Sequence, residues 1–101
     1  MILMGTYTMP NDKAEEWKKC ISDLAANPPT EGIKKWQTFS CSNEYGYKGY
    51  NLIFTEKGKE DEALLEIAKT MFPFTQIEGT SWKLEPLMNV TDSLNVLEKN
   101  R

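Results

Sequence analysis

The sequence predicts an α+β fold of the ferredoxin-like type: a βαββαβ order with a four-stranded antiparallel sheet, two helices on one face and a short C-terminal helix. Three observations predict it. Residues 32–56 hold two strand-like runs around a polar turn, a helical pattern stands on each side of them, and a further strand-like run lies beyond each helical pattern. This order is typical of split βαβ units. At 101 residues, the chain is expected to form a single domain, 1–101.

The first strand is predicted over Ile2–Met9. Both of its alternating sets are largely apolar, which favours a central strand covered on both faces. Either set can therefore face the helices. Pro10 ends this strand because proline has no N–H to donate to a neighbouring strand.

The first helix is predicted to begin near Asp12, with Glu15 three residues later as in a capping box. Its apolar residues recur at helical spacing: Ala14, Trp17, Cys20, Ile21, Leu24 and Ala25. The run Asn27-Pro28-Pro29 ends the helix, because a residue before proline is disfavoured in the α region.

The hairpin is predicted to turn at Ser42–Gly46, because Asn43 and Gly46 tolerate positive φ. This turn pairs Cys41 with Tyr47 and Gln37 with Asn51. Two faces follow. The face expected to pack on the helices carries Trp36, Thr38, Tyr50, Leu52 and Phe54. The face expected to stay uncovered carries Gln37, Phe39, Cys41, Tyr47, Asn51 and Ile53. A slip of one residue would exchange these sets.

The second helix is predicted over residues 58–72, with acidic residues in its first turn, where the helix dipole favours them. Pro73 is expected to end it. Residues 74–79 fit either a loop or the start of a strand. Residues 81–88 are predicted as an edge strand because they contain Pro86, and residues 90–99 as a short helix.

One face of the predicted sheet is left without helices. Apolar surface of this kind is favourable to bury, by roughly 25 cal/mol per Å², and monomers rarely expose a large patch of it. Either the C-terminal helix or a second copy can cover the face. Because the helix is short, we expect a homodimer that packs sheet to sheet.

Composition excludes several classes of function. The net charge is −3, without the basic surplus of a nucleic-acid-binding protein. Histidine is absent, which removes Ser-His-Asp catalysis and histidine-ligated metals. No apolar run approaches the roughly 20 residues of a membrane span, and Met1–Met4 is too short for a signal peptide. We therefore expect a cytoplasmic protein that binds neither nucleic acid nor membranes.

The order and length of the chain resemble the dimeric α+β barrel superfamily. Within it, the chain is similar to a family of small uncharacterised archaeal and bacterial proteins. The resemblance is carried by ILMGTYTM, by Pro28-Pro29 with Glu31-Gly32-Ile33-Lys34, by Gly46 and Gly49, and by Leu84-Glu85-Pro86-Leu87-Met88. It implies a dimer with a pocket between sheet and helices or inside the barrel, and no agreed activity.

The candidate ligand-binding residues are Tyr7, Gln37, Phe39, Tyr47 and Asn51. On the predicted uncovered face, the Gln37 and Asn51 amides can orient a ligand carbonyl or hydroxyl, while the aromatic rings stack around it. Alternatively, the two amides bond to each other at a dimer interface. No catalytic residue, cofactor or metal site is predicted.

Three functions remain open. The first is the binding of a small molecule without catalysis. The second is catalysis as a cofactor-independent monooxygenase or isomerase of the barrel superfamily. The third is protein interaction through the hairpin edge. A pocket with a buried carboxylate would favour an enzyme, and a pocket without titratable groups would favour binding.

Overall fold

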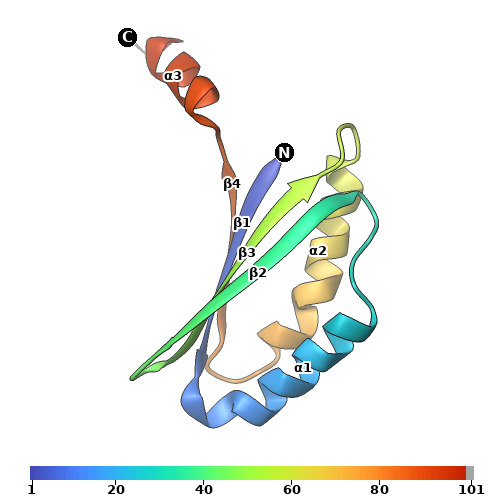
Figure 1. Ribbon diagram of the computed structural model, residues 1–101, viewed down its shortest axis with the longest axis vertical. Helices are drawn as coiled ribbons and strands as arrows, with labels where there is room; N and C mark the ends of the chain where they lie inside the picture. The colour runs from blue at the N-terminus through green and yellow to red at the C-terminus, as the bar shows by residue number, and fades with distance from the viewer. Residues whose placement is uncertain (100–101) are drawn as a thin grey trace.

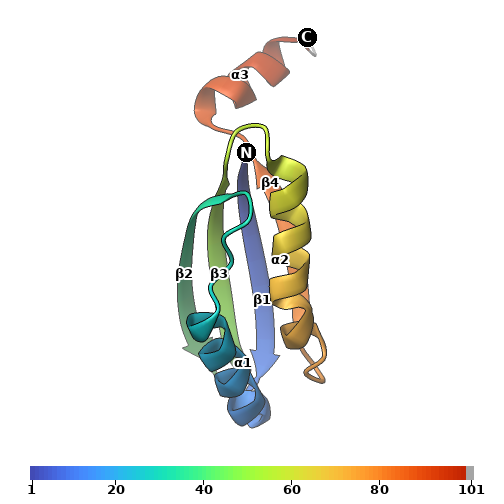
Figure 2. The same ribbon diagram turned by 90° about the vertical axis from the view of Figure 1, so that its right-hand side faces the viewer.

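The computed structural model describes residues 1–99 and confirms the predicted fold class. Its elements are β1 (Ile2–Pro10), the 3₁₀ turn η1 (Asn11–Lys13), α1 (Ala14–Ala26), β2 (Ile33–Asn43), β3 (Gly46–Thr55), α2 (Glu60–Thr75), β4 (Ser81–Leu87) and α3 (Val90–Lys99). The sheet has the order β2-β3-β1-β4, with antiparallel neighbours. Helices α1 and α2 cover one side of the sheet, the helix side, and leave the other, the open side, without helices (Figures 1 and 2).

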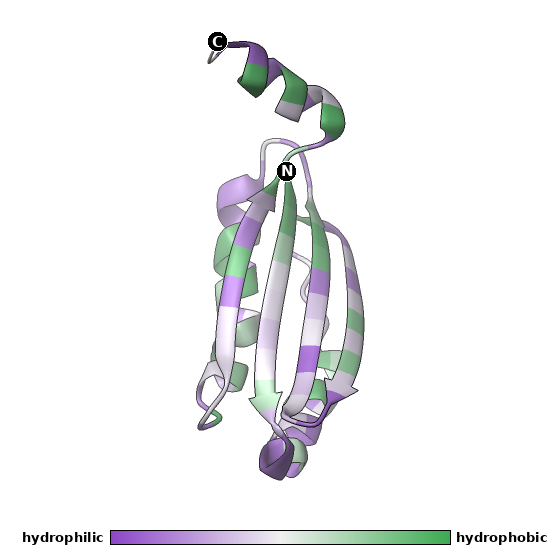
Figure 3. Ribbon diagram, turned by 90° about the vertical axis from the view of Figure 1, so that its left-hand side faces the viewer, coloured by the Kyte–Doolittle hydropathy of each residue, from purple (hydrophilic) through white to green (hydrophobic). Residues whose placement is uncertain are grey.

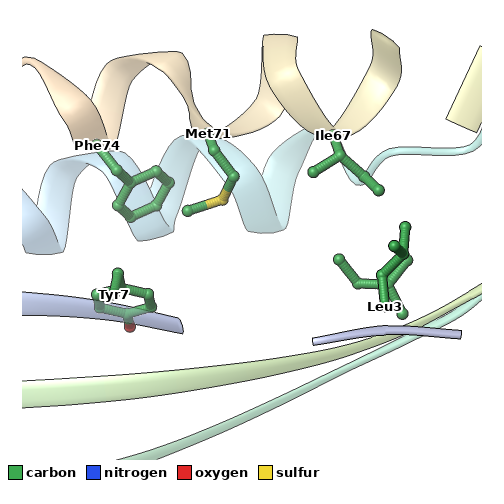
Figure 4. Close-up of a cluster of buried hydrophobic side chains, with 6 residues drawn as sticks. Leu3, Tyr7, Ile67, Met71 and Phe74 are labelled. Carbon is green, nitrogen blue, oxygen red and sulfur yellow. The ribbon is translucent and has the colours of Figure 1, made fainter. Parts of the chain in front are cut away.

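The core lies between the central strands and α2. Odd-numbered residues of β1 point to the helix side, because the burial along this strand alternates with a period of two. The buried cluster joins β1, β3 and α2 (Figure 4) and consists of Leu3, Tyr7, Ile53, Ile67, Met71 and Phe74. The even-numbered residues of β1 therefore belong to the open side.

The predicted hairpin register is wrong by one residue. Asn43 pairs with Gly46, and Gln37 lies opposite Leu52 rather than Asn51. The reason is a tighter turn than expected: Oδ1 of Asn43 accepts hydrogen bonds from the backbone N–H groups of Tyr45 (2.8 Å) and Gly46 (3.0 Å). This side-chain bond to the backbone two residues on is an Asx-turn, and it leaves a connection of two residues.

The observed register reverses the predicted assignment of β3 side chains to the two sides of the sheet. Asn51 and Ile53 are buried on the helix side, whereas Tyr50, Leu52 and Phe54, expected beneath the helices, lie on the open side. On β2 the predicted alternation is right, since Trp36 packs against the core. Ile33 packs there as well, although it is an odd number of positions from Trp36. A β-bulge between Ile33 and Lys35 adds one residue to the strand and so turns Ile33 to the helix side.

Helix α2 continues through Pro73 to Thr75, beyond its predicted end at Phe72. Proline is costly in a helix interior because its ring clashes with the preceding turn, yet Phe74 is 2% exposed and its ring lies 6.0 Å from that of Tyr7. Burying an aromatic side chain of this size contributes about 1.5–3 kcal/mol, which offsets much of the cost of the proline.

Helix α3 does not cover the open side. It stands beyond the end of the sheet (Figure 1), and none of its residues is buried. Within residues 1–99, none of the helices has the length and apolar character needed to cross a membrane.

Candidate functional site

A groove of about 350 Å³ opens between α1 and the sheet on the helix side. Its walls come from three segments: α1, the link from α1 to β2, and the facing residues of β1 and β2. The lining residues are Tyr7, Trp17, Ile21, Leu24, Ala25, Pro28, Pro29, Trp36, Thr38 and Ser40. We call this the α1 groove.

The α1 groove exists because α1 leaves β2 partly uncovered. Helix α1 has no buried residue, and its apolar stripe is only half-buried at Trp17, Ile21 and Leu24. Pro28 and Pro29 then restrict the backbone of the link to β2, since proline fixes φ and disfavours the helical conformation in the residue before it. The helix therefore ends above the sheet, and a gap stays open over the outer half of β2.

Asn51 fixes the floor of the groove. It is 2% exposed, and its Oδ1 accepts hydrogen bonds from Trp36 Nε1 and Thr38 Oγ1, both at 2.9 Å. Its Nδ2 donates to the carbonyl oxygen of Gly5 at 3.3 Å. The amide thus ties β2 and β1 to β3 and orients two residues that line the groove. Asn51 therefore positions lining residues without lining the groove itself, and its Oδ1 already accepts two hydrogen bonds.

An aromatic cluster closes the inner end of the groove. Trp17 Nε1 donates to the hydroxyl of Tyr7 at 3.1 Å, and the Trp17 ring stacks on Tyr47, with centroids 5.9 Å apart and planes at 2°. Gly49 permits this packing, because a Cβ there would overlap the ring carbons of Tyr7. Burial raises the pKa of Tyr7, and the hydrogen bond from Trp17 lowers it by less. The phenol therefore stays protonated at neutral pH and can donate to a ligand.

The structure separates the sequence-predicted site residues into two groups. Tyr7, Tyr47 and Asn51 lie on the helix side, and Tyr7 lines the groove. Gln37 lies on the open side opposite Leu52, and Phe39, 56% exposed, lies there too. The predicted pair of amides on one face is therefore wrong, since the sheet itself separates Gln37 from Asn51.

Sequence reasoning missed most of the groove. It placed Trp17 in the apolar stripe of the first helix and Trp36 on the strand face expected beneath the helices, and it assigned neither these residues nor Pro28 and Pro29 to a ligand site. The available signal was their order along the chain: an apolar helical stripe, two prolines, then Trp36 and Thr38 alternating on one strand. The depth of the gap depends on how far α1 stands from β2, which no local pattern encodes.

Titratable groups are scarce around the α1 groove. Of its lining residues only Tyr7 is titratable, and the two carboxylates near β4, Glu78 and Glu85, are exposed. Among residues 1–99, no group of three or more acidic, cysteine or histidine side chains is placed to hold a metal ion. What the groove offers is apolar contact, one phenol and two hydroxyls.

Comparison with known proteins assigns no family. No family model matches the chain, and no curated protein matches it. Among solved structures, it is similar to a DUF3240 family protein from Shewanella baltica, with 9% identity over 87% of this chain and 91% of that chain, and a TM-score of 0.35. A TM-score this low carries no assignment of fold or function.

Proposed function

We propose that this protein binds a small, largely apolar molecule in the α1 groove without catalysing a reaction. The observation that carries the proposal is an open apolar groove whose walls are held in place by hydrogen bonds behind them. Its volume of about 350 Å³ lies at the lower end of the range for ligand pockets, roughly 300–1,000 Å³. The ligand class that fits is a flat ring system with one hydrogen-bond acceptor.

The chemistry of the lining supports this ligand class. Trp17 and Trp36 offer flat apolar surfaces, and Tyr7 offers a hydroxyl proton that is not donated to another side chain within residues 1–99. Thr38 already donates to Asn51, so its oxygen keeps lone pairs for a ligand donor. Binding without catalysis is supported by a lining in which the one titratable side chain is a phenol with a raised pKa, since proton transfer near neutral pH needs a group that titrates there.

The proposal also includes a cytoplasmic location and a homodimer of the barrel superfamily. Cys20 and Cys41 are free thiols, as is usual in a reducing compartment. The second copy is expected on the open side, across the sheet from the α1 groove. Ligand binding by one copy therefore does not require the other.

The indole N–H signals of the three tryptophans provide the test. With coumarin as the probe, a flat ring system with a carbonyl acceptor, the N–H signals of Trp17 and Trp36 are expected to shift in ¹H–¹⁵N spectra. The signal of Trp82 is the internal control, since its ring packs over Gly5 and Trp82 is not one of the lining residues. Equal shifts at all three signals, or none at millimolar coumarin, would refute the assignment.

A pair of variants locates the probe. Ala25 lines the groove and Ala26, its neighbour, does not. The Ala25→Phe substitution should fill the groove and weaken coumarin binding by roughly tenfold or more, as expected for loss of a well-packed contact, whereas Ala26→Phe should leave binding unchanged. Oxygen uptake or a new product during the titration would contradict the non-catalytic part of the proposal.

A further inference from the structure

Helix α3 presents an apolar stripe that the rest of its own chain does not bury. Val90, Leu94 and Leu97 follow an i, i+4, i+7 spacing, which places them on one face of a helix. They are 78%, 53% and 65% exposed. A helix of 10 residues is also shorter than the roughly 12–15 residues that an isolated helix needs to be even marginally stable in water. Both facts indicate that α3 packs on another surface.

The link to β4 directs α3 away from its own sheet. Only Met88 and Asn89 separate the two elements. Asn89 caps the helix: its Oδ1 accepts from the backbone N–H of Asp92 at 2.7 Å, and its carbonyl oxygen accepts from that of Ser93 at 3.0 Å. In Figure 1, α3 leaves the end of the sheet toward the side opposite to α1 and α2. The helix and the open side of the sheet thus face the same region of space.

The open side has the composition of an interface. Its centre is formed by Met4, Tyr50 and Leu52 of β1 and β3, with Phe54 toward one end; Figure 3 looks onto this side. Lysines lie around it. Lys35 Nζ is 5.9 Å from the Phe54 ring centroid and Lys48 Nζ is 5.4 Å from that of Tyr50, so their stems extend over the rings. An apolar centre with a charged rim is the usual anatomy of a protein interface.

The size of the open side suits a second copy. Strand β1 has nine residues, about 30 Å at 3.3 Å per residue, and four strands span about 19 Å, so the sheet face measures about 570 Å². Helix α3, about 15 Å long and 10 Å wide, adds about 150 Å². Together they approach the roughly 800 Å² that each partner buries in a stable interface.

We propose that, within the homodimer of the proposed function, α3 of each copy packs its stripe of Val90, Leu94 and Leu97 on the other copy. A second copy is the occupant that accounts for both surfaces at once. In a two-fold dimer, α3 of each chain covers part of the other chain, so that the stripe and the open side are buried in both copies. The inference rests on the homodimer part of the proposed function, and it is independent of ligand binding because the α1 groove lies on the other side of the sheet.

Light scattering on the full chain gives the first test. A mass of twice 11.6 kDa at micromolar concentration is expected, and the mass of a single chain would overturn the proposal. Leu94→Asp should weaken the dimer by roughly tenfold or more, whereas Asn95→Asp, with the same charge change on another face of α3, should not. On the sheet, Leu52→Lys should also favour the monomer, with Leu65→Lys on the exposed face of α2 as its control.

A second measurement needs no variant. In a mixture of isotope-labelled and unlabelled chains, filtered nuclear Overhauser spectra report contacts between copies alone. We expect contacts between the methyl groups of Leu94 or Leu97 in one chain and those of Met4 or Leu52 in the other. A dimer in which α3 contacts only its own chain, or in which Leu94→Asp leaves the affinity unchanged, would refute the exchange of α3.

Discussion

Replacing Asn51 by leucine is expected to destabilise the fold, although the two side chains have similar volumes. The substitution leaves the Trp36 indole N–H, the Thr38 hydroxyl and the Gly5 carbonyl without the partner that Asn51 provides. Thr38 is exposed, so water replaces its bond at little cost. The other two groups are more enclosed, and a buried polar group without its partner costs about 1–3 kcal/mol.

The two enclosed groups together give an expected loss of about 2–6 kcal/mol, partly offset by the apolar side chain, so we expect a net loss of about 2–3 kcal/mol in the free energy of unfolding. For a domain of this size, that corresponds to a fall of roughly 10–20 °C in Tm. Urea unfolding at a fixed protein concentration measures it, because association shifts apparent stability. Asn95→Leu, on exposed α3, is the matched control.

A double-mutant cycle assigns the loss to the hydrogen bonds. Trp36→Phe removes the indole N–H, so the cost of Asn51→Leu should be smaller by about 1 kcal/mol or more in that background. Two results would contradict this assignment: an Asn51→Leu variant as stable as the native protein, or additive effects of the two substitutions. Either result would mean that the amide is not the tie between β2 and β3.

Three further outcomes are expected. Gly49→Ala should lower the free energy of unfolding by about 3 kcal/mol, because the buried Tyr7 ring must move. Gly58→Ala, at φ +83 with open space around it, should lower it by only about 1–2 kcal/mol, from backbone strain alone. Urea unfolding compares the two variants. Because the pKa of Tyr7 is raised in the fold, its contribution to stability is fully present below the unfolded value of about 10 and lost as the pH rises through the folded pKa. Between pH 9 and roughly 11, the free energy of unfolding should therefore fall less with rising pH in Tyr7→Phe than in the native protein. The same pH dependence in both proteins would contradict this. Iodoacetamide should alkylate exposed Cys41 before half-buried Cys20, whose pKa is raised by burial and then by Asp23; mass spectrometry of the peptides decides the order.

The order of elements could be predicted because each is encoded locally. Helix α1 follows from the spacing of Trp17, Ile21 and Leu24, and its end from two prolines. The central position of β1 follows from apolar residues on both of its sets. These signals depend on periodicity and on the backbone restrictions of proline, and they need no knowledge of distant contacts.

The register could not be predicted in the same way, because it depends on one side chain in the turn. Asn43 accepts from two backbone N–H groups and shortens the connection to two residues. A change of one residue moves every side chain of β3 to the other side of the sheet. The candidate site was divided for that reason: Asn51 moved under the helices while Gln37 stayed on the open side. Likewise, the continuation of α2 through Pro73 depends on a distant contact of Phe74 with Tyr7.

Strand β3 gives the two proposed surfaces a common support. On one side Asn51 holds Trp36 and Thr38 in the wall of the α1 groove, and on the other its neighbours Tyr50 and Leu52 form the centre of the open side. Alternation along a strand keeps such surfaces chemically separate, because adjacent side chains point in opposite directions. It also makes the turn at Asn43 decisive for both, since the register that it sets determines which residues each surface receives. A substitution at Asn43 should therefore disturb the groove and the open side together, whereas changes at Asn51 or Leu52 act first on the side that each residue faces.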